Sequence, residues 1–62
     1  MKDIEKLLNI DELSEIIGLS QSAIYKMVNT KRIPYVKVGR LVKFEPIKIR
    51  LWIEQNSVKI SN

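Results

Sequence analysis

The stretch GLSQSAIYKMV, residues 18–28, decides the fold, because it holds a turn and the start of a new helix. Gly18 is the residue that most readily takes the left-handed backbone conformation in which helices end. Ser20 is a favoured N-cap residue, so a helix is predicted from Gln21 to about Thr30. Two helices joined by so short a turn cannot continue in one line, and they are expected to pack across each other.

The helix predicted after Ser20 has two different faces. At 100° per residue, apolar side chains share the inner face: Ala23, Ile24, Met27 and Val28. The opposite face holds side chains that can form hydrogen bonds, with no acid that would repel phosphate: Ser22, Tyr25, Lys26 and Asn29. This second face is either a nucleic-acid contact or the ordinary solvated side of a helix.

A short amphipathic helix is predicted before Gly18. Asn9 followed by Glu12 forms a capping box, in which each side chain satisfies a backbone donor at the helix start. An apolar stripe follows at helical spacing: Ile10, Leu13, Ile16 and Ile17. The stripe lies opposite Asp11, Glu12 and Glu15, as expected of an amphipathic helix.

A β-hairpin is predicted after Ile33-Pro34, where proline stops helical winding. Residues 35–38 and 41–44 are β-rich runs around Gly39-Arg40. Alternation predicts that Val36 and Val38 face the core while Tyr35 and Lys37 face water. Three cations surround the turn and make the hairpin basic: Lys37, Arg40 and Lys43.

A last helix is predicted from Glu45-Pro46 to about Asn56, since proline is tolerated in the first turn. Its core stripe is Ile49, Trp52 and Ile53. Ile47 and Leu51 point roughly opposite and form an exposed apolar pair, a candidate protein interface. The tail of residues 57–62 has no cap or clear periodicity, and we expect it to be disordered.

Length and composition exclude several classes of protein. Sixty-two residues predict one domain, residues 1–62, with its core at about 7–54. The chain has no Cys and no His, which removes disulfides, thiolate nucleophiles, the usual zinc ligand sets and an imidazole base. We therefore expect no enzyme, no cofactor, no metal and no small-molecule ligand. No apolar run is long enough to cross a bilayer and no secretion signal is visible, so a cytoplasmic location and no membrane partner are expected.

Charge is distributed unevenly along the chain, although the net charge is only +4. Residues 1–19 carry net −3, whereas residues 16–44 contain no acid at all. Six cations lie in that acid-free block: Lys26, Lys31, Arg32, Lys37, Arg40 and Lys43. Such a block indicates a surface for a polyanion, or a solvated face on which cations have gathered by chance.

The predicted elements follow the winged helix-turn-helix pattern. Two helices are joined by a turn with glycine, and a basic hairpin and a short helix that contains Trp52 follow them. In this order the chain resembles the excisionase-like DNA-binding domain family, relatives of the MerR-type winged helix. The resemblance covers about residues 7–54 and rests on these anchors: Leu8, Ile10, Glu12, Leu13, Ile16, Ile17, GLSQSAIYKMV (18–28), RIPYVKVGR (32–40), Phe44, Ile49, Trp52 and Ile53. It implies a mainly α fold with a small β-hairpin, in the order α-α-β-β-α.

The resemblance implies roles for eleven residues. At the start of the second helix, Ser20 suits a phosphate, Gln21 can bond adenine, and Ser22 can approach a base or a phosphate. Contacts to DNA backbone or groove are implied for the others, with Arg40 at a minor groove: Tyr25, Lys26, Asn29, Lys31, Arg32, Lys37, Arg40 and Lys43. Relatives usually have Gly at the position of Lys31, so either Lys31 is left-handed or the loop differs. They usually have an acid at the position of Lys48.

The function implied is sequence-specific binding of double-stranded DNA by a bacterial or phage-encoded protein. One form is an excisionase-type recombination directionality factor of a mobile element, with an integrase or a second, cooperatively bound copy as partner. Another is a small transcription regulator that uses the same contacts. A third, less favoured, is a protein-interaction module that binds through Ile47 and Leu51.

Overall fold

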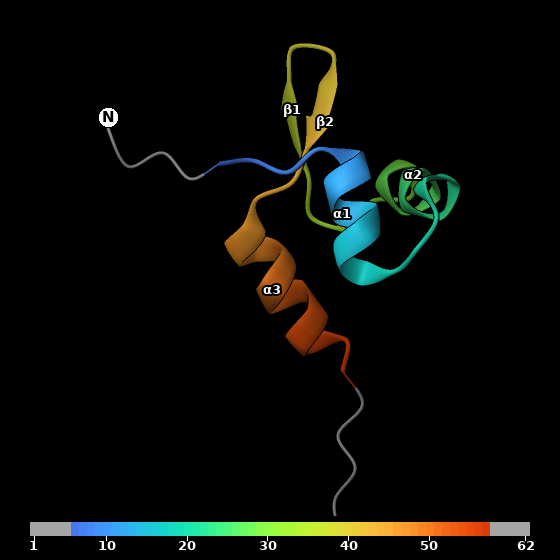
Figure 1. The fold of residues 1–62 in the computed structure, drawn as a ribbon, viewed down its shortest axis with the longest axis vertical. Coiled ribbons are helices and arrows are strands. Elements are labelled where there is room, and N and C mark those ends of the chain that lie inside the picture. Colours follow the sequence, from blue (N-terminus) through green and yellow to red (C-terminus); the bar gives the residue numbers. More distant parts are fainter. Residues whose placement is uncertain (1–5, 58–62) are drawn as a thin grey trace, which may run out of the picture.

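The computed structural model describes residues 6–57, which form three helices and one antiparallel hairpin (Figure 1). The helices are α1 (Ile10–Ile17), α2 (Gln21–Asn29) and α3 (Pro46–Gln55), and the strands are β1 (Val36–Val38) and β2 (Leu41–Lys43). The hairpin projects from one end of the helical body and α3 runs away from it at the other. The order α-α-β-β-α confirms the predicted winged helix-turn-helix.

The ends of α1 and α2 lie where the sequence predicts them. The Asn9 side chain accepts from the Glu12 amide at 2.9 Å and Glu12 Oε1 accepts from the Asn9 amide at 3.0 Å, which completes the capping box. Gly18 ends α1 with φ 73°. Ser20 Oγ accepts from the Ala23 amide at 3.1 Å and caps α2. These local features fix where α1 begins and ends and where α2 begins.

The core draws on every helix and on the chain around the hairpin. Six buried residues form it: Leu13, Ile24, Val28, Ile33, Phe44 and Ile49. Two of the predicted core stripes are too wide, because Ile16 is 61% exposed and Ile53 is 41% exposed. Both line a surface groove between α1 and α3, since these short helices bury only the narrow strip that faces the centre.

The hairpin faces the core with the opposite side of β1 from the one predicted. Val36 pairs with Lys43 and Val38 with Leu41, and residues opposite each other in an antiparallel pair point to the same face. Phe44 is fully buried and Val42 packs against the core, so Tyr35, opposite Phe44, also lies on the inner face. Tyr35 does pack against the core, whereas Val38 is 49% exposed. The prediction that Val36 and Val38 face inward is wrong.

A short segment before α1 extends the hairpin. The Leu8 amide donates to the Phe44 carbonyl at 2.8 Å, and the Phe44 amide donates to the Leu8 carbonyl at 2.9 Å. This bridge ties the start of the fold to the junction between β2 and α3. The base of the hairpin is therefore fixed to the helical body, while its tip projects beyond it.

The start of α3 matches the prediction, with Glu45 as N-cap and Pro46 in the first turn, and the helix ends at Gln55 with Asn56 as C-cap. Ser57 is the last described residue, and its Oγ donates to the Ile53 carbonyl at 3.0 Å. The disorder predicted for the tail falls, beyond Ser57, outside the described residues. Within residues 6–57, no helix has the length and apolar character needed to cross a membrane.

Candidate nucleic-acid interface

The outer face of α2 presents its polar side chains to solvent. Ser22, Tyr25, Lys26 and Asn29 are all exposed, and Tyr25 retains 47% of its surface. Beneath them, Ile24 and Val28 are buried in the core and hold the helix in place. The predicted inner and outer faces of this helix are confirmed, so its four polar side chains project from a rigid element.

The start of α2 is an anion-accepting helix end. The first N–H groups of a helix have no partner within the helix, and here Ser20 satisfies that of Ala23. The amides of Gln21 and Ser22 remain directed out of the helix end, where the helix dipole favours negative charge. Ser20 Oγ accepts a hydrogen bond in the cap, and its own O–H is still able to donate.

Lys31 ends α2 in the left-handed conformation, with φ 57°, where relatives of the resembled family usually have glycine. Its amide donates to the Val28 carbonyl at 3.0 Å, and the Arg32 amide donates to the Met27 carbonyl at 2.8 Å. These two bonds are the Schellman motif that commonly closes helices on glycine. Of the two alternatives left open by the sequence, Lys31 therefore takes the left-handed one.

Arg32 forms hydrogen bonds through both its side chain and its backbone carbonyl. Its Nε donates to Thr30 Oγ1 at 3.0 Å, and its backbone carbonyl accepts from Trp52 Nε1 at 2.9 Å. Trp52 packs against the core, as predicted, but its indole N–H also ties α3 to the turn after α2. This contact could not be predicted from local sequence patterns, because the two residues are twenty positions apart.

The Arg32 side chain separates two surface hollows. One, of about 360 Å³, lies along α2 and is lined by Ser22, Lys26 and Met27 among others. The other, of about 460 Å³, lies between the turn and α3 and is lined by Lys31, Lys48 and Leu51 among others. Arg32 lines both, so Lys26 and Lys31 border two hollows that share Arg32.

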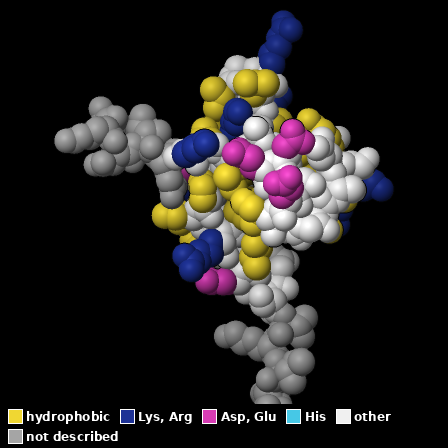
Figure 2. Space-filling model, viewed as in Figure 1, with side chains coloured by type: hydrophobic (Ala, Val, Ile, Leu, Met, Phe, Trp, Pro, Cys, Tyr) yellow, Lys and Arg dark blue, Asp and Glu magenta, His cyan; other side chains and the backbone are white. Residues whose placement is uncertain are grey.

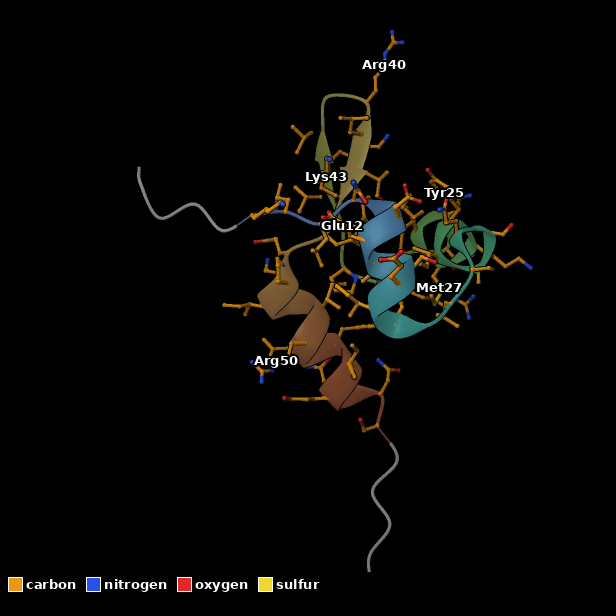
Figure 3. All side chains as sticks on the ribbon, in the orientation of Figure 1. Glu12, Tyr25, Met27, Arg40, Lys43 and Arg50 are labelled. Atoms are coloured by element: carbon orange, nitrogen blue, oxygen red, sulfur yellow. The ribbon has the colours of Figure 1, made fainter. Side chains whose placement is uncertain are left out.

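The hairpin carries its cations in different directions. Gly39 has φ 64°, which allows the tight turn, and Arg40 extends outward from the tip (Figure 3). The pairing of Lys37 with Val42 and of Lys43 with Val36 sends the two lysines to opposite faces of the hairpin. Lys37 is exposed and Lys43 is half-buried. The three hairpin cations therefore do not line one side of the hairpin: Arg40 is at the tip, Lys37 and Lys43 lie on opposite faces, and Lys43 is at the end of the pairing farthest from the turn.

Acids and cations occupy different parts of the surface. Asp11, Glu12 and Glu15 all belong to α1, and Figure 2 shows acidic side chains gathered over this helix. Within residues 6–57 the only ion pairs are Lys6 to Glu12 at 4.0 Å and Lys48 to Glu45 at 3.5 Å. The cations of α2 and of the hairpin enter neither pair, so no acid in the described chain neutralises them.

Ile47 and Leu51 are exposed by 58% and 52%, as predicted for an apolar pair on the outer side of α3. Leu51 lines the hollow that also holds Lys31 and Lys48, whereas Ile47 lies outside it. In the described part of the chain, no three Asp, Glu, His or Cys side chains come together as metal ligands do.

A capped helix pair, an acid-free outer helix face and a basic wing define a DNA-binding domain of the winged helix-turn-helix class. The model of the helix-turn-helix domain family matches residues 7–57, most of the chain, and the protein belongs to that family. Domains of this class bind DNA and are typically not enzymes. No curated protein and no solved structure matches the chain significantly.

Proposed function

We propose that this protein binds double-stranded DNA sequence-specifically, with α2 in the major groove and the hairpin against the adjacent minor groove. The observation that carries the proposal is the outer face of α2, which exposes four hydrogen-bonding side chains and no acid on a buried scaffold. Major-groove base edges are read by side chains of this kind on a helix. The proposed contact residues are those of α2, its closing turn and the hairpin: Ser20, Gln21, Ser22, Tyr25, Lys26, Asn29, Lys31, Arg32, Lys37, Arg40 and Lys43.

The biological role we propose is that of an excisionase-type recombination directionality factor of a mobile element. It is supported by the resemblance of residues 7–54 and by the small size of the contact surface. One helix and one wing bury only about 600–1,000 Å² of protein on DNA. Tight binding then calls for a neighbour on the DNA, either a second copy or an integrase.

The first experiment is a titration of the purified protein against duplexes from its own genomic neighbourhood, with scrambled duplexes as reference. Five or six phosphate contacts predict that log affinity falls with log salt concentration at a slope of about −4 to −6. Lys26→Ala and Arg40→Ala should each weaken binding and reduce the slope by about 0.9. Arg50→Ala is the matched control, since Arg50 lines the groove between α1 and α3. Equal affinity for scrambled DNA, with no effect of either substitution, would refute the proposal.

A second assay separates the two DNA-binding roles. A plasmid that carries the attachment sites and the integrase of the same element should recombine toward excision only when this protein is present. Repression or activation of a promoter without any effect on excision would instead identify a transcription regulator.

The exposure of Ile47 and Leu51 favours a second candidate function, a protein-interaction module. Under that alternative, Ile47→Ser with Leu51→Ser would abolish partner binding, and DNA affinity would show a flat response to salt. A steep response that survives the double substitution would exclude it.

A further inference from the structure

A contact between α1 and α2 reaches the start of the proposed reading helix. Gln21, the first residue of α2, donates through Nε2 to Oδ1 of Asp11 in the first turn of α1. Both side chains are exposed, so the contact is made at the surface and is not imposed by core packing. It places an acid of α1 beside the residue best suited to read a base.

The chemistry of the two groups fixes which way the glutamine amide faces. An ionised carboxylate accepts hydrogen bonds and cannot donate, so it can be satisfied only by the NH₂ end of the amide. The amide nitrogen has two hydrogens and Asp11 uses one of them. The Gln21 carbonyl oxygen and the second N–H therefore remain available. Those two groups are what a glutamine needs to bond N6 and N7 of adenine together.

We propose that Asp11 is a positioning residue that holds Gln21 ready for adenine and thereby sets base preference at one position of the target. The inference rests on the proposed DNA-binding function. A long glutamine side chain loses rotamer freedom when it binds, and fixing such a side chain weakens affinity by roughly 2- to 12-fold. The contact with Asp11 fixes Gln21 before DNA arrives, so this loss is largely avoided.

The charge of Asp11 and its contact with Gln21 are expected to have opposite effects on DNA binding. Asp11 carries a negative charge near a surface proposed to meet phosphates, so its removal alone should raise affinity for any duplex slightly. Its positioning role predicts the opposite effect on selectivity. A loss of base preference together with unchanged or higher affinity for scrambled DNA is therefore a signature that a merely structural role would not produce.

The test begins with selection of preferred duplexes by the full-length protein from a randomised pool. Gln21→Ala identifies the position that Gln21 reads, where adenine should be preferred by roughly 5- to 150-fold. Asp11→Ala should reduce that preference by roughly 2- to 12-fold. Asp11→Asn keeps an oxygen acceptor without the charge, and should retain the preference. Glu15→Ala removes another exposed acid of α1 and is the matched control.

The outcomes separate this inference from the function on which it rests. Wild-type protein that binds scrambled and selected duplexes equally would remove the proposed function itself. Full adenine preference in Asp11→Ala, or an equal loss in Asp11→Asn and Glu15→Ala, would overturn the positioning role alone. Circular dichroism checks the fold of each variant, and Asp11→Ser, too short to reach Gln21, provides a second variant for the same loss.

Discussion

Replacement of Lys31 by glycine should make the protein more stable and its DNA binding weaker. Lys31 has φ 57°, and a residue with a Cβ pays roughly 1–2 kcal/mol in this conformation. Glycine avoids that strain but loses more freedom on folding, which takes back roughly 0.5–1 kcal/mol. The net gain in the free energy of unfolding is about 0.5–1 kcal/mol. In a domain of this size such a gain raises Tm by about 2–8 °C.

Lys31→Ala separates the backbone from the charge. Alanine keeps the Cβ and the strain but removes the ammonium group, so its Tm should stay near that of the wild type. Both variants should reduce the salt slope of DNA binding by about 0.9, because one phosphate contact is lost. Thermal unfolding followed by circular dichroism, with DNA titrations on the same preparations, measures both effects. A glycine variant that unfolds at or below the temperature of the alanine variant would refute the argument from strain.

Two further substitutions test contacts within the fold. Trp52→Phe removes the 2.9 Å hydrogen bond to the Arg32 carbonyl and should lower the free energy of unfolding by about 1 kcal/mol and weaken DNA binding, since Arg32 loses its anchor to α3. Unchanged unfolding and titration curves would show that this hydrogen bond contributes nothing. Val38 lies on the exposed face of the hairpin, so Val38→Thr should change the free energy of unfolding by less than about 0.5 kcal/mol. Val42 packs against the core, so Val42→Thr should lower the free energy of unfolding by more than about 1 kcal/mol. Equal effects in urea unfolding would contradict the observed register.

The helix boundaries could be predicted because their signals are local. Asn9 with Glu12, Gly18 and Ser20 act within three or four residues of themselves, through hydrogen bonds that the sequence spacing already implies. The exposed face of α2 followed from the same short-range periodicity. These features need no knowledge of which distant segments meet.

Contacts between distant residues could not be predicted in the same way. The bond from Trp52 to Arg32 and the contact of Gln21 with Asp11 depend on the angles at which helices cross. Leu8 pairs with Phe44, and the two residues are brought together only by the folding of the helices and the hairpin between them. Ile16 was assigned to the core because helical spacing identifies a stripe but not its width, which depends on the neighbour that covers it.

The wrong face of the hairpin has a different cause, because the information was present in the sequence. A two-residue turn at Gly39-Arg40 makes Val38 and Leu41 partners, so alternation puts Tyr35 and Phe44 on one face. Because paired residues point to the same face, the inner face of one strand determines the inner face of the other. Phe44 is the larger apolar residue near the body of the fold, and burying it carries Tyr35 and Val42 inward and turns Val36 and Val38 outward. Lys37 lies on the inner face opposite Val42, which packs against the core, yet Lys37 itself remains exposed.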